Sequence, residues 1–308
     1  MAHPLAPYPS PERREALLDE LGSKAEIVVY GESREGRPLR AVRIPSFAPG
    51  LPRVLCTANI HGPELIGCWM ALELLQRLAV GSLEERAVLR ERAEVWIAPC
   101  LNPDGYARTW EAEGRGRLVD LRTNAAAVDL NRNFPPPAGK STSNFPWAGS
   151  SRRGSANYRG PEPLSEPETA ALDAHLGGQG FHASINLHSF MGTVIPARVT
   201  DRSHFATYKR LAGCFRAAQG QFRYRRLSAR RLDVYTGELE DHQHHNRGCW
   251  AMCAEIMTVG FSYRQHMWAP SLFWRFNPRD PDPWATNDIP AIRAYLLAAL
   301  DVPRPFPR

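Results

Sequence analysis

The most informative stretch of the chain reads Arg53-Val54-Leu55-Cys56-Thr57-Ala58-Asn59-Ile60-His61-Gly62-Pro63-Glu64. Its first six residues predict a buried strand, and the apolar spacing from Glu64 to Leu78 predicts an amphipathic helix. His61 and Glu64 therefore fall on a strand-to-helix turn, where open α/β sheets place their sites. A His and a carboxylate three positions apart can both reach one metal ion. On its own, the pair is equally compatible with a hydrogen-bonded loop histidine.

A second histidine stands at the end of another apolar run, Ser184-Ile185-Asn186-Leu187-His188. With His61 and Glu64 it completes a set of two imidazoles and one carboxylate. Such a set leaves the fourth position of a tetrahedral zinc ion open for water. The sequence thus predicts one Zn²⁺ ion, held by His61, Glu64 and His188.

Strands and helices alternate along the chain, which indicates a mixed α/β sheet. A glycine-containing link between 25–30 and 39–44 suggests a hairpin of two strands. The further predicted elements are strands at 53–58, 94–99, 181–187 and 250–256 and helices at 64–79, 83–92, 166–176, 202–219 and 288–300.

We find no internal repeat and no linker, and therefore expect a single α/β domain over 25–301. Its sheet should be mixed, mostly parallel, twisted and flanked by helices. Residues 1–24 are expected to form a loose N-terminal extension and 302–308 a C-terminal tail. The Pro-, Gly- and Ser-rich stretch 134–163 predicts a long irregular loop, and such loops usually serve a site or are disordered.

Composition excludes several classes of protein. Of the 308 residues, 43% are hydrophobic and 23% charged, which is ordinary for a soluble globular protein. No apolar run reaches the roughly 18 residues of a membrane span, so no membrane partner is expected. The net charge of +6 comes from arginines spread over the whole length, without a nucleic-acid-binding module. We therefore expect no nucleic-acid partner.

The cellular compartment is inferred from the cysteines and from the amino terminus. The six cysteines are scattered, mostly in apolar segments, and indicate reduced core thiols. The stretch Met1 to Glu12 has no signal-peptide pattern. Both observations favour a cytoplasmic protein.

Further motifs follow the first one in a fixed order. They are Asn102-Pro103-Asp104-Gly105, the string Asp129-Leu130-Asn131-Arg132-Asn133-Phe134, the strand end His188-Ser189 and a late strand that ends in Glu255. Together with H-x-x-E, these motifs resemble the zinc carboxypeptidase family of the carboxypeptidase A type, from about residue 25 to residue 300. The chain looks like a bacterial-type, cytoplasmic member without a propeptide. One departure is Pro63, where the digestive members often have an arginine.

The resemblance implies catalytic roles for two residues. Glu255 matches the family's general base, which takes a proton from the zinc-activated water. It stands in an otherwise apolar strand, where burial of an unpaired charge is costly; a buried ion-pair partner is the alternative interpretation. Arg122 matches the arginine that stabilises the developing oxyanion, although it could instead be a surface arginine.

The resemblance also implies residues that bind the substrate and support the metal. Asn131 and Arg132 match the pair that binds the terminal carboxylate, a task that suits a planar guanidinium. Asp129 matches the carboxylate that accepts a hydrogen bond from the first zinc histidine, or is an ordinary turn aspartate. Tyr235, 20 residues before Glu255, has nearly the spacing of the family's mobile tyrosine, or is a packed loop tyrosine.

Two segments have a less definite interpretation. In the family, residues of the segment that contains Glu238, Glu240 and Asp241 tend to form the pocket that selects the terminal side chain of the substrate. Acids in such a pocket would favour a basic terminal residue. A solvated loop is the simpler interpretation for them, and surface positions are expected for the histidines at 242, 244 and 245. The tryptophan-rich segment 266–286 is expected to be core or a subunit contact.

The resulting prediction is a zinc-dependent metallocarboxypeptidase that hydrolyses the C-terminal amide bond of a peptide. Its substrate would be a peptide or a small amide with a free carboxylate. Two alternatives stay open. One is a zinc amidase or deacylase that acts on cell-wall peptides or N-acyl amino acids; the other is a non-catalytic binding module that kept the fold. The oligomeric state does not follow from the sequence.

Overall fold

Eight strands form one mixed sheet in the computed structural model, which describes residues 3–22, 25–144, 148–227 and 234–306. The strand order is β1-β2-β4-β3-β5-β8-β6-β7. The strands are β1 (Glu26–Glu32), β2 (Pro38–Ile44), β3 (Arg53–Ala58), β4 (Glu94–Ala98), β5 (Ala183–Ser189), β6 (Thr193–Pro196), β7 (Arg225–Arg226) and β8 (Trp250–Ile256).

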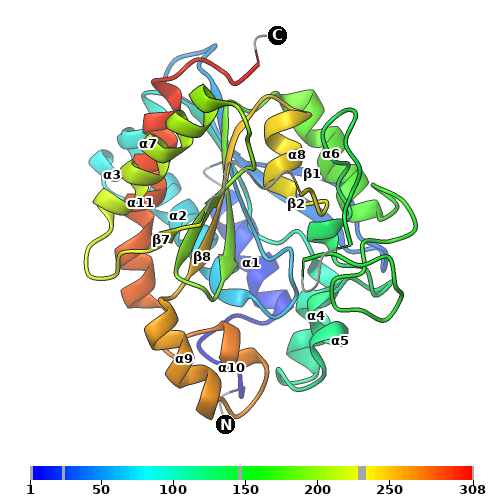
Figure 1. The fold of residues 1–308 in the computed structure, drawn as a ribbon. Helices are drawn as coiled ribbons and strands as arrows, with labels where there is room; N and C mark the ends of the chain where they lie inside the picture. The colour runs from blue at the N-terminus through cyan, green and yellow to red at the C-terminus, as the bar shows by residue number, and fades with distance from the viewer. Residues whose placement is uncertain (1–2, 23–24, 145–147, 228–233, 307–308) are drawn as a thin grey trace.

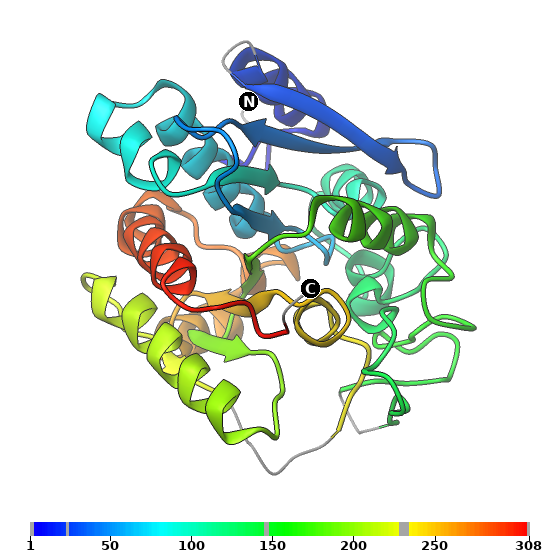
Figure 2. The ribbon, with the colours of Figure 1, turned by 90° about the horizontal axis from the view of Figure 1, so that it is seen from above.

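Helices cover both faces of this sheet, with α2, α7 and α11 on one face and α6 and α8 on the other (Figures 1 and 2). The helices are α1 (Pro11–Gly22), α2 (Leu65–Val80), α3 (Leu83–Arg90), α4 (Pro103–Glu111), α5 (Leu118–Arg122), α6 (Pro167–Gln179), α7 (Arg202–Ala218), α8 (Leu239–His245), α9 (Val259–Trp268), α10 (Phe273–Phe276) and α11 (Asp282–Leu300), with a 3₁₀ turn η1 (Leu130–Arg132). The expected single α/β domain with a mixed sheet is confirmed.

The four central strands β4, β3, β5 and β8 run parallel to one another. The predicted hairpin is present as the antiparallel pair β1–β2, and β6 pairs antiparallel with β8. Covered on both faces, the central strands are buried along nearly their whole length. Their near-continuous apolar runs follow from this position.

The register of the central strands decides where the polar side chains meet. Ala58 at the end of β3 pairs with Leu187 of β5, and His188 pairs with Glu255 of β8. Because parallel strands end at one edge of the sheet, His61, His188 and Glu255 come to the same edge. The motifs that are far apart in the sequence are neighbours for this reason.

The amino-terminal residues are folded onto the domain, contrary to the loose extension that we expected. Residues 11–22 form helix α1, and Leu5, Tyr8 and Leu18 are buried in the main core. The Tyr8 hydroxyl donates to the carbonyl of Pro278, 2.8 Å away. The proline-rich composition concealed this contact, because its apolar partners lie at the other end of the chain.

The expected solvated loop around residues 238–245 was also wrong, because this segment is the buried helix α8. Glu240, Asp241 and His242 are at most 4% exposed, and His244 is fully buried. Helix α8 packs against β5 and β8. Its polar composition resembles a surface segment, but Glu240 lines a polar cavity, and His242 and His244 contact Asp173 and the Tyr208 hydroxyl.

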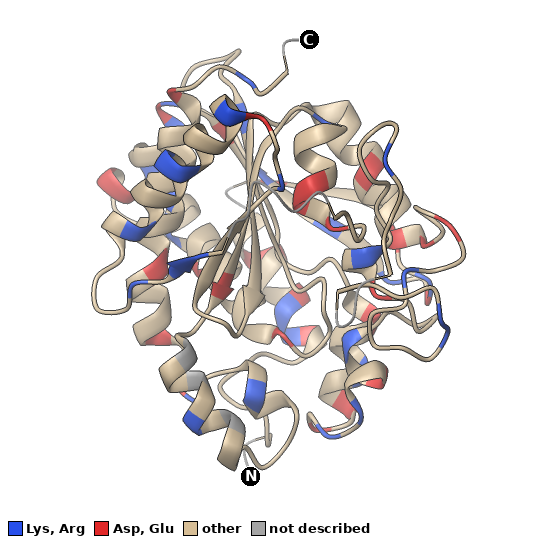
Figure 3. Ribbon diagram, in the orientation of Figure 1, with Lys and Arg blue, Asp and Glu red and all other residues tan. Residues whose placement is uncertain are grey.

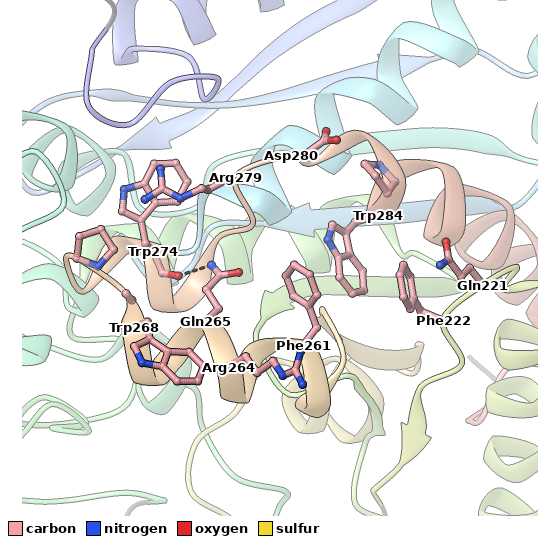
Figure 4. Close-up of a pocket in the computed structure, with 13 residues that line it drawn as sticks. Gln221, Phe222, Phe261, Arg264, Gln265, Trp268, Trp274, Arg279, Asp280 and Trp284 are labelled. Atoms are coloured by element: carbon pink, nitrogen blue, oxygen red, sulfur yellow. Dashed lines mark hydrogen bonds between the residues drawn. The ribbon is translucent and has the colours of Figure 1, made fainter.

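Much of the tryptophan-rich segment belongs to the core, as Trp274, Trp284, Phe273 and Phe276 are buried. Trp268 on α9 is different, with 76% of its surface exposed. Trp268, Trp274 and Trp284 line a pocket between α9 and the start of α11, together with Phe222 and Phe261 (Figure 4). Its volume is about 790 Å³. It shares no lining residue with the cavity at the strand ends that is described below.

Charged residues of both signs are distributed over the surface. In the view of Figure 3, basic residues are interspersed with acidic ones over the helices and loops.

Among the described residues, no single helix combines the length and the hydropathy needed to cross a membrane. Helices α2 and α3 meet those criteria only when taken together, and they are bent by 105° with respect to each other.

Gly62 offers a test of how tightly the first motif is packed. A Cβ at this position would lie 2.2 Å from the carbonyl oxygen of Leu121 and 2.6 Å from that of Gly105. Backbone atoms cannot move aside cheaply, so Gly62→Ala should lower the free energy of unfolding by roughly 1–3 kcal/mol. Gly213→Ala is the matched control, because it lies on an exposed face of α7 with no atom within 4 Å. It should stabilise by up to about 1 kcal/mol. Urea denaturation that ranks the two variants in the opposite order would contradict this description of the packing.

Candidate metal centre

Three side chains converge at the carboxyl ends of β3 and β5. The Nδ1 atom of His61 lies 2.8 Å from Oε1 of Glu64, and Nδ1 of His188 lies 3.1 Å from Oε2 of the same carboxylate. All three residues are at most 3% exposed. One ligand atom from each lies within 4.8 Å of the others, which is close enough to hold one metal ion. Two imidazoles and one carboxylate are a donor set that fits catalytic zinc.

A tight turn after β3 presents His61 and Glu64 on the same side. Asn59 has a φ of 54°, a conformation that asparagine tolerates better than most residues. Its side-chain amide donates to the carbonyls of His61 and Gly62, at 3.0 and 3.3 Å. Asn102 of the N-P-D-G motif donates from its Nδ2 to the carbonyl of Ile60, at 3.2 Å. This motif therefore holds the metal-binding turn in place.

The protonation states of Glu64 and His188 suit metal binding, whereas the surrounding carboxylates favour a proton on His61, which a metal ion would have to displace. Burial would raise the pKa of Glu64, but His61 and His188 outweigh it and hold the pKa of this carboxyl far below its usual range. Burial lowers the pKa of His188, so this imidazole is neutral at pH 7. Burial also opposes a charge on His61, yet the carboxylates of Glu64 and Asp129 raise its pKa. An ionised carboxylate and a neutral imidazole are the forms that bind a metal.

Asp129 fixes the orientation of the first histidine. Its Oδ1 lies 3.2 Å from Nε2 of His61, so this nitrogen donates to it and Nδ1 is left for a metal. The other carboxylate oxygen accepts from Nε of Arg122 at 3.0 Å. Burial would raise the pKa of Asp129, but Arg122 and His61 hold it well below the usual range. One ionised carboxylate thus positions both a metal ligand and a guanidinium.

Glu255 lies beside the metal centre. One of its ligand atoms is within 4.8 Å of those of His188 and Cys253. Its Oε2 atom is buried and has no hydrogen-bond partner among the described residues. Burial and the nearby carboxylate of Glu64 raise the pKa of Glu255 to about 8. A carboxyl with a free oxygen and a raised pKa is suited to accept and release a proton.

Arg122, Asn131 and Arg132 line the same cavity as the metal ligands and Glu255, and its volume is about 320 Å³. Asn131 accepts from the backbone N–H of Leu239 at 2.9 Å, which joins η1 to α8. Nη1 of Arg132 donates to the carbonyl of Asn131, while its buried Nε has no partner among the described residues. Arg122 and Arg132 therefore bring two guanidinium groups to one small cavity.

Tyr235 does not reach this cavity. It is 4% exposed, and its ring packs edge-on against His245 at a centroid distance of 5.6 Å. Its backbone forms a bridge with Thr142. The structure therefore shows the packed loop tyrosine that was the alternative interpretation.

Two further polar residues of the cavity, Arg198 and Asn157, had no recognisable signal in the sequence. Arg198 follows β6, which pairs with β8, the strand that carries Glu255. The side chain of Arg198 therefore lines the same cavity as Glu255. Asn157 comes from the long loop 134–163. Glu238 and Glu240 also line the cavity, as the specificity-pocket interpretation of these acids implied, and so does Ser189 next to His188. The remaining lining residues, which the sequence did not single out for the site, are Leu118, Phe190, Met191, Ile195, Leu227, Cys253 and Phe276.

Asp129→Asn should weaken zinc binding by about 10- to 100-fold, because the amide no longer fixes the charge and tautomer of His61. The affinity is measured by competition with a chromophoric chelator. Asp120→Asn is the control, since Asp120 lies on the exposed side of α5, paired with Arg117. Equal affinities in both variants would remove the role of Asp129 in the metal centre.

Known proteins share this arrangement of elements. Carboxypeptidase A from Helicoverpa armigera superposes with a TM-score of 0.73 at 20% identity, over 96% of this chain and 74% of that chain, which shows a common fold. The zinc carboxypeptidase of Simulium vittatum is 31% identical over 166 residues, or 52% of this chain and 51% of that protein. The catalytic chain of human carboxypeptidase N is 34% identical over 202 residues, or 61% of this chain and 42% of that protein. The chain thus spans about half, or less, of the length of the Simulium and human proteins.

A family model described as zinc carboxypeptidase matches residues 15–270. This range contains the three candidate ligands, their supporting aspartate and Glu255. Because the match extends over most of the sequence, the chain belongs to the zinc carboxypeptidase family.

Proposed function

We propose that this protein is a zinc-dependent metallocarboxypeptidase that removes the C-terminal residue of a peptide. The observation that supports it best is the convergence on one cavity of three kinds of group. A ligand set for zinc, a carboxyl with an unpartnered oxygen and the three guanidinium groups of Arg122, Arg132 and Arg198 all line a cavity of about 320 Å³. A non-catalytic binding module would have no physical need for a buried carboxyl with an unpartnered oxygen beside the metal ligands.

Zinc, when bound by His61, Glu64 and His188, supplies a Lewis acid that polarises the scissile carbonyl and acidifies a water molecule. Glu255 then serves as the general base. Its ionised form is favoured beside a bound cation, because an opposite charge lowers the pKa of a neighbouring carboxyl. The proton that Glu255 takes from the attacking water passes to the nitrogen of the leaving amine as the amide bond breaks.

Arg122 is placed to stabilise the negative charge that develops on the carbonyl oxygen. Its guanidinium lies 3.0 Å from the carboxylate of Asp129 and 3.8 Å from that of Glu64, and these contacts fix its orientation. The carboxylates of Asp129 and Glu64 outweigh burial and raise its pKa further, so it remains charged. A preoriented cation costs no reorganisation during the reaction.

Asn131 and Arg132 are proposed to bind the free carboxylate of the substrate. Arg132 is buried in the cavity wall and keeps an unpartnered Nε donor. A guanidinium donor matches the geometry of a carboxylate, and burial strengthens the interaction. This anchor would select substrates that end in a carboxylate over those that end in an amide.

Glu255→Gln should lower kcat for peptide hydrolysis by about 10²- to 10⁴-fold, because the amide cannot accept the proton. Zinc affinity should stay within a few-fold of the wild type, since Glu255 is not one of the three proposed ligands. The assay follows release of the terminal residue from a panel of peptides. N-acyl amino acids and cell-wall peptides are included in the panel. Faster turnover of these compounds than of any peptide would favour an amidase or deacylase, and full activity of the variant would remove the mechanism.

Arg132→Lys should raise KM for a peptide with a free C-terminus by about 10- to 100-fold, as expected when a hydrogen bond to a charged group is lost. The same change should have little effect on the slow hydrolysis of the C-terminally amidated peptide. Arg117→Lys is the control, because Arg117 is exposed and pairs with Asp120. An equal loss for the free and the amidated peptide would argue against carboxylate recognition by Arg132.

A further inference from the structure

A buried arginine on helix α1 is connected to the metal-binding turn by hydrogen bonds, although it has no part in the proposed reaction. Arg14 is only 3% exposed. Its Nε and Nη2 atoms donate to the carboxylate of Glu15, at 3.0 and 2.6 Å, and its guanidinium lies 4.4 Å from the centroid of the Tyr106 ring. These contacts fix the orientation of the guanidinium and leave its Nη1 atom for a further acceptor.

The further acceptor is the thiol of Cys100, which follows β4. Nη1 of Arg14 donates to Sγ of Cys100 at 3.2 Å, and the same thiol donates to Oδ1 of Asn59 at 3.1 Å. Asn59 in turn donates from Nδ2 to the carbonyls of His61 and Gly62. A continuous series of hydrogen bonds therefore extends from α1 to the turn that carries the first candidate metal ligand.

The direction of each hydrogen bond in this series is fixed by chemistry. A guanidinium only donates, and a carbonyl oxygen only accepts. Cys100 therefore accepts from Arg14, and its single proton is directed to Asn59. Burial raises the pKa of the Cys100 thiol to about 11, although Arg14 opposes the shift, so the thiol carries this proton at pH 7. The amide of Asn59 must then present its oxygen to the thiol and its nitrogen to the turn.

The side chain of Asn59 is the link between this series and the metal ligands. Asn59 is fully buried, and its φ of 54° lies in the left-handed region. Its amide is thus enclosed in the core at the point where the chain turns from β3 toward His61. An amide that lost its partner there could not replace it with bulk water, and it would leave a buried polar group unsatisfied.

Packing alone does not explain why an arginine occupies this place in the core. Apolar residues of similar volume often replace buried ionic groups without loss of stability. Arg14 has one carboxylate partner, Glu15, whose side chain is 30% exposed. The burial of the guanidinium is explained instead by the orientation that it gives to Cys100 and, through the thiol, to Asn59.

We propose that Cys100 and Asn59 are positioning residues of the metal centre. The thiol, held by Arg14, orients the amide, and the amide holds the turn in the conformation in which His61 binds zinc. Helix α1 then belongs to the framework of the metal centre as well as to the core. This inference rests on the zinc site of the proposed function, and it concerns metal affinity rather than substrate recognition.

Two variants of Cys100 separate hydrogen bonding from packing. Cys100→Ala removes both the acceptor for Arg14 and the donor to Asn59, whereas the hydroxyl of Cys100→Ser can form both hydrogen bonds. We expect Cys100→Ala to weaken zinc binding by about 2- to 10-fold, the effect of a neutral hydrogen bond, and Cys100→Ser to restore the wild-type affinity to within about 2-fold. The affinity of the full chain for zinc is measured by competition with a chromophoric chelator.

Cys68→Ala is the matched control for the loss of a buried thiol. Cys68 belongs to the same hydrophobic core as Cys100 but lies outside the series from Arg14 to His61. Both alanine variants should lower the free energy of unfolding of the metal-free protein in urea. Only Cys100→Ala should also weaken zinc binding, since a merely structural role would leave the zinc affinity of both variants unchanged.

Asn59→Gly tests whether Cys100 acts through the amide. Glycine adopts a positive φ readily, so the variant removes the side chain and leaves the backbone conformation accessible. It should weaken zinc binding by about 10-fold, because two hydrogen bonds to the turn are lost. The double variant should bind zinc within about 2-fold of Asn59→Gly, since residues that act in series are not additive. Glu113→Gly is the control, at an exposed residue with a φ of 51°.

The outcomes distinguish this inference from the proposed function. Zinc binding is measured without a peptide, so zinc binding without hydrolysis of any peptide would overturn the proposed function alone. Equal zinc affinities of the wild type and Cys100→Ala, or additive effects in the double variant, would overturn only the positioning role. Asn59→Gly decides the same question if Cys100→Ala does not fold. A wild-type chain that binds no zinc would overturn both.

Discussion

The contact of one buried carboxylate with two imidazoles is the constraint on which the site depends. Glu64 lies 2.8 Å from His61 and 3.1 Å from His188, although 124 residues separate Glu64 from the second histidine. This contact exists only because β3 and β5 are adjacent parallel strands that end together. A shift of the register by one residue would turn His188 to the other face of the sheet. The hydrophobic packing of the central strands is therefore also what assembles the metal centre.

A second buried carboxylate, that of Asp129, connects the metal ligands to the residues of the cavity. Asp129 contacts His61 and Arg122 and also accepts from the backbone N–H of Asn131 at 3.0 Å. The D-x-N-R-N-F motif therefore acts as one unit. Asp129 orients a metal ligand and a guanidinium, and Asn131 and Arg132 line the cavity. Networks of this kind hold their members rigidly, because every buried charge in them has a partner. The pKa of Asp129, far below its usual range, reflects this pairing.

The atoms of the cavity that lack partners are as informative as those that are paired. Arg132 Nε, Ser189 Oγ, Glu240 Oε2 and Glu255 Oε2 are buried without hydrogen-bond partners among the described residues, and all four residues line the cavity. Other unpartnered buried atoms are distributed over the rest of the described residues. Each such atom costs free energy, and a bound molecule could supply partners only to those that belong to the cavity. The unpartnered donor of Arg132 and the unpartnered acceptor of Glu255 agree with the proposed roles of these residues in carboxylate binding and in proton transfer.

Local patterns in the sequence were sufficient for the strands, most helices and the H-x-x-E turn, because apolar periodicity reports which faces of an element are buried. They also predicted that His61, Glu64 and His188 would meet, since each ends or follows a strand. They failed for α8, for Tyr235, for residues 3–22 and for Arg198. The burial of these residues depends on partners that are distant in the sequence, such as β6, η1 and the segment around Pro278. A polar segment looks the same in the sequence whether it faces water or a polar cavity, and only the tertiary structure decides between the two.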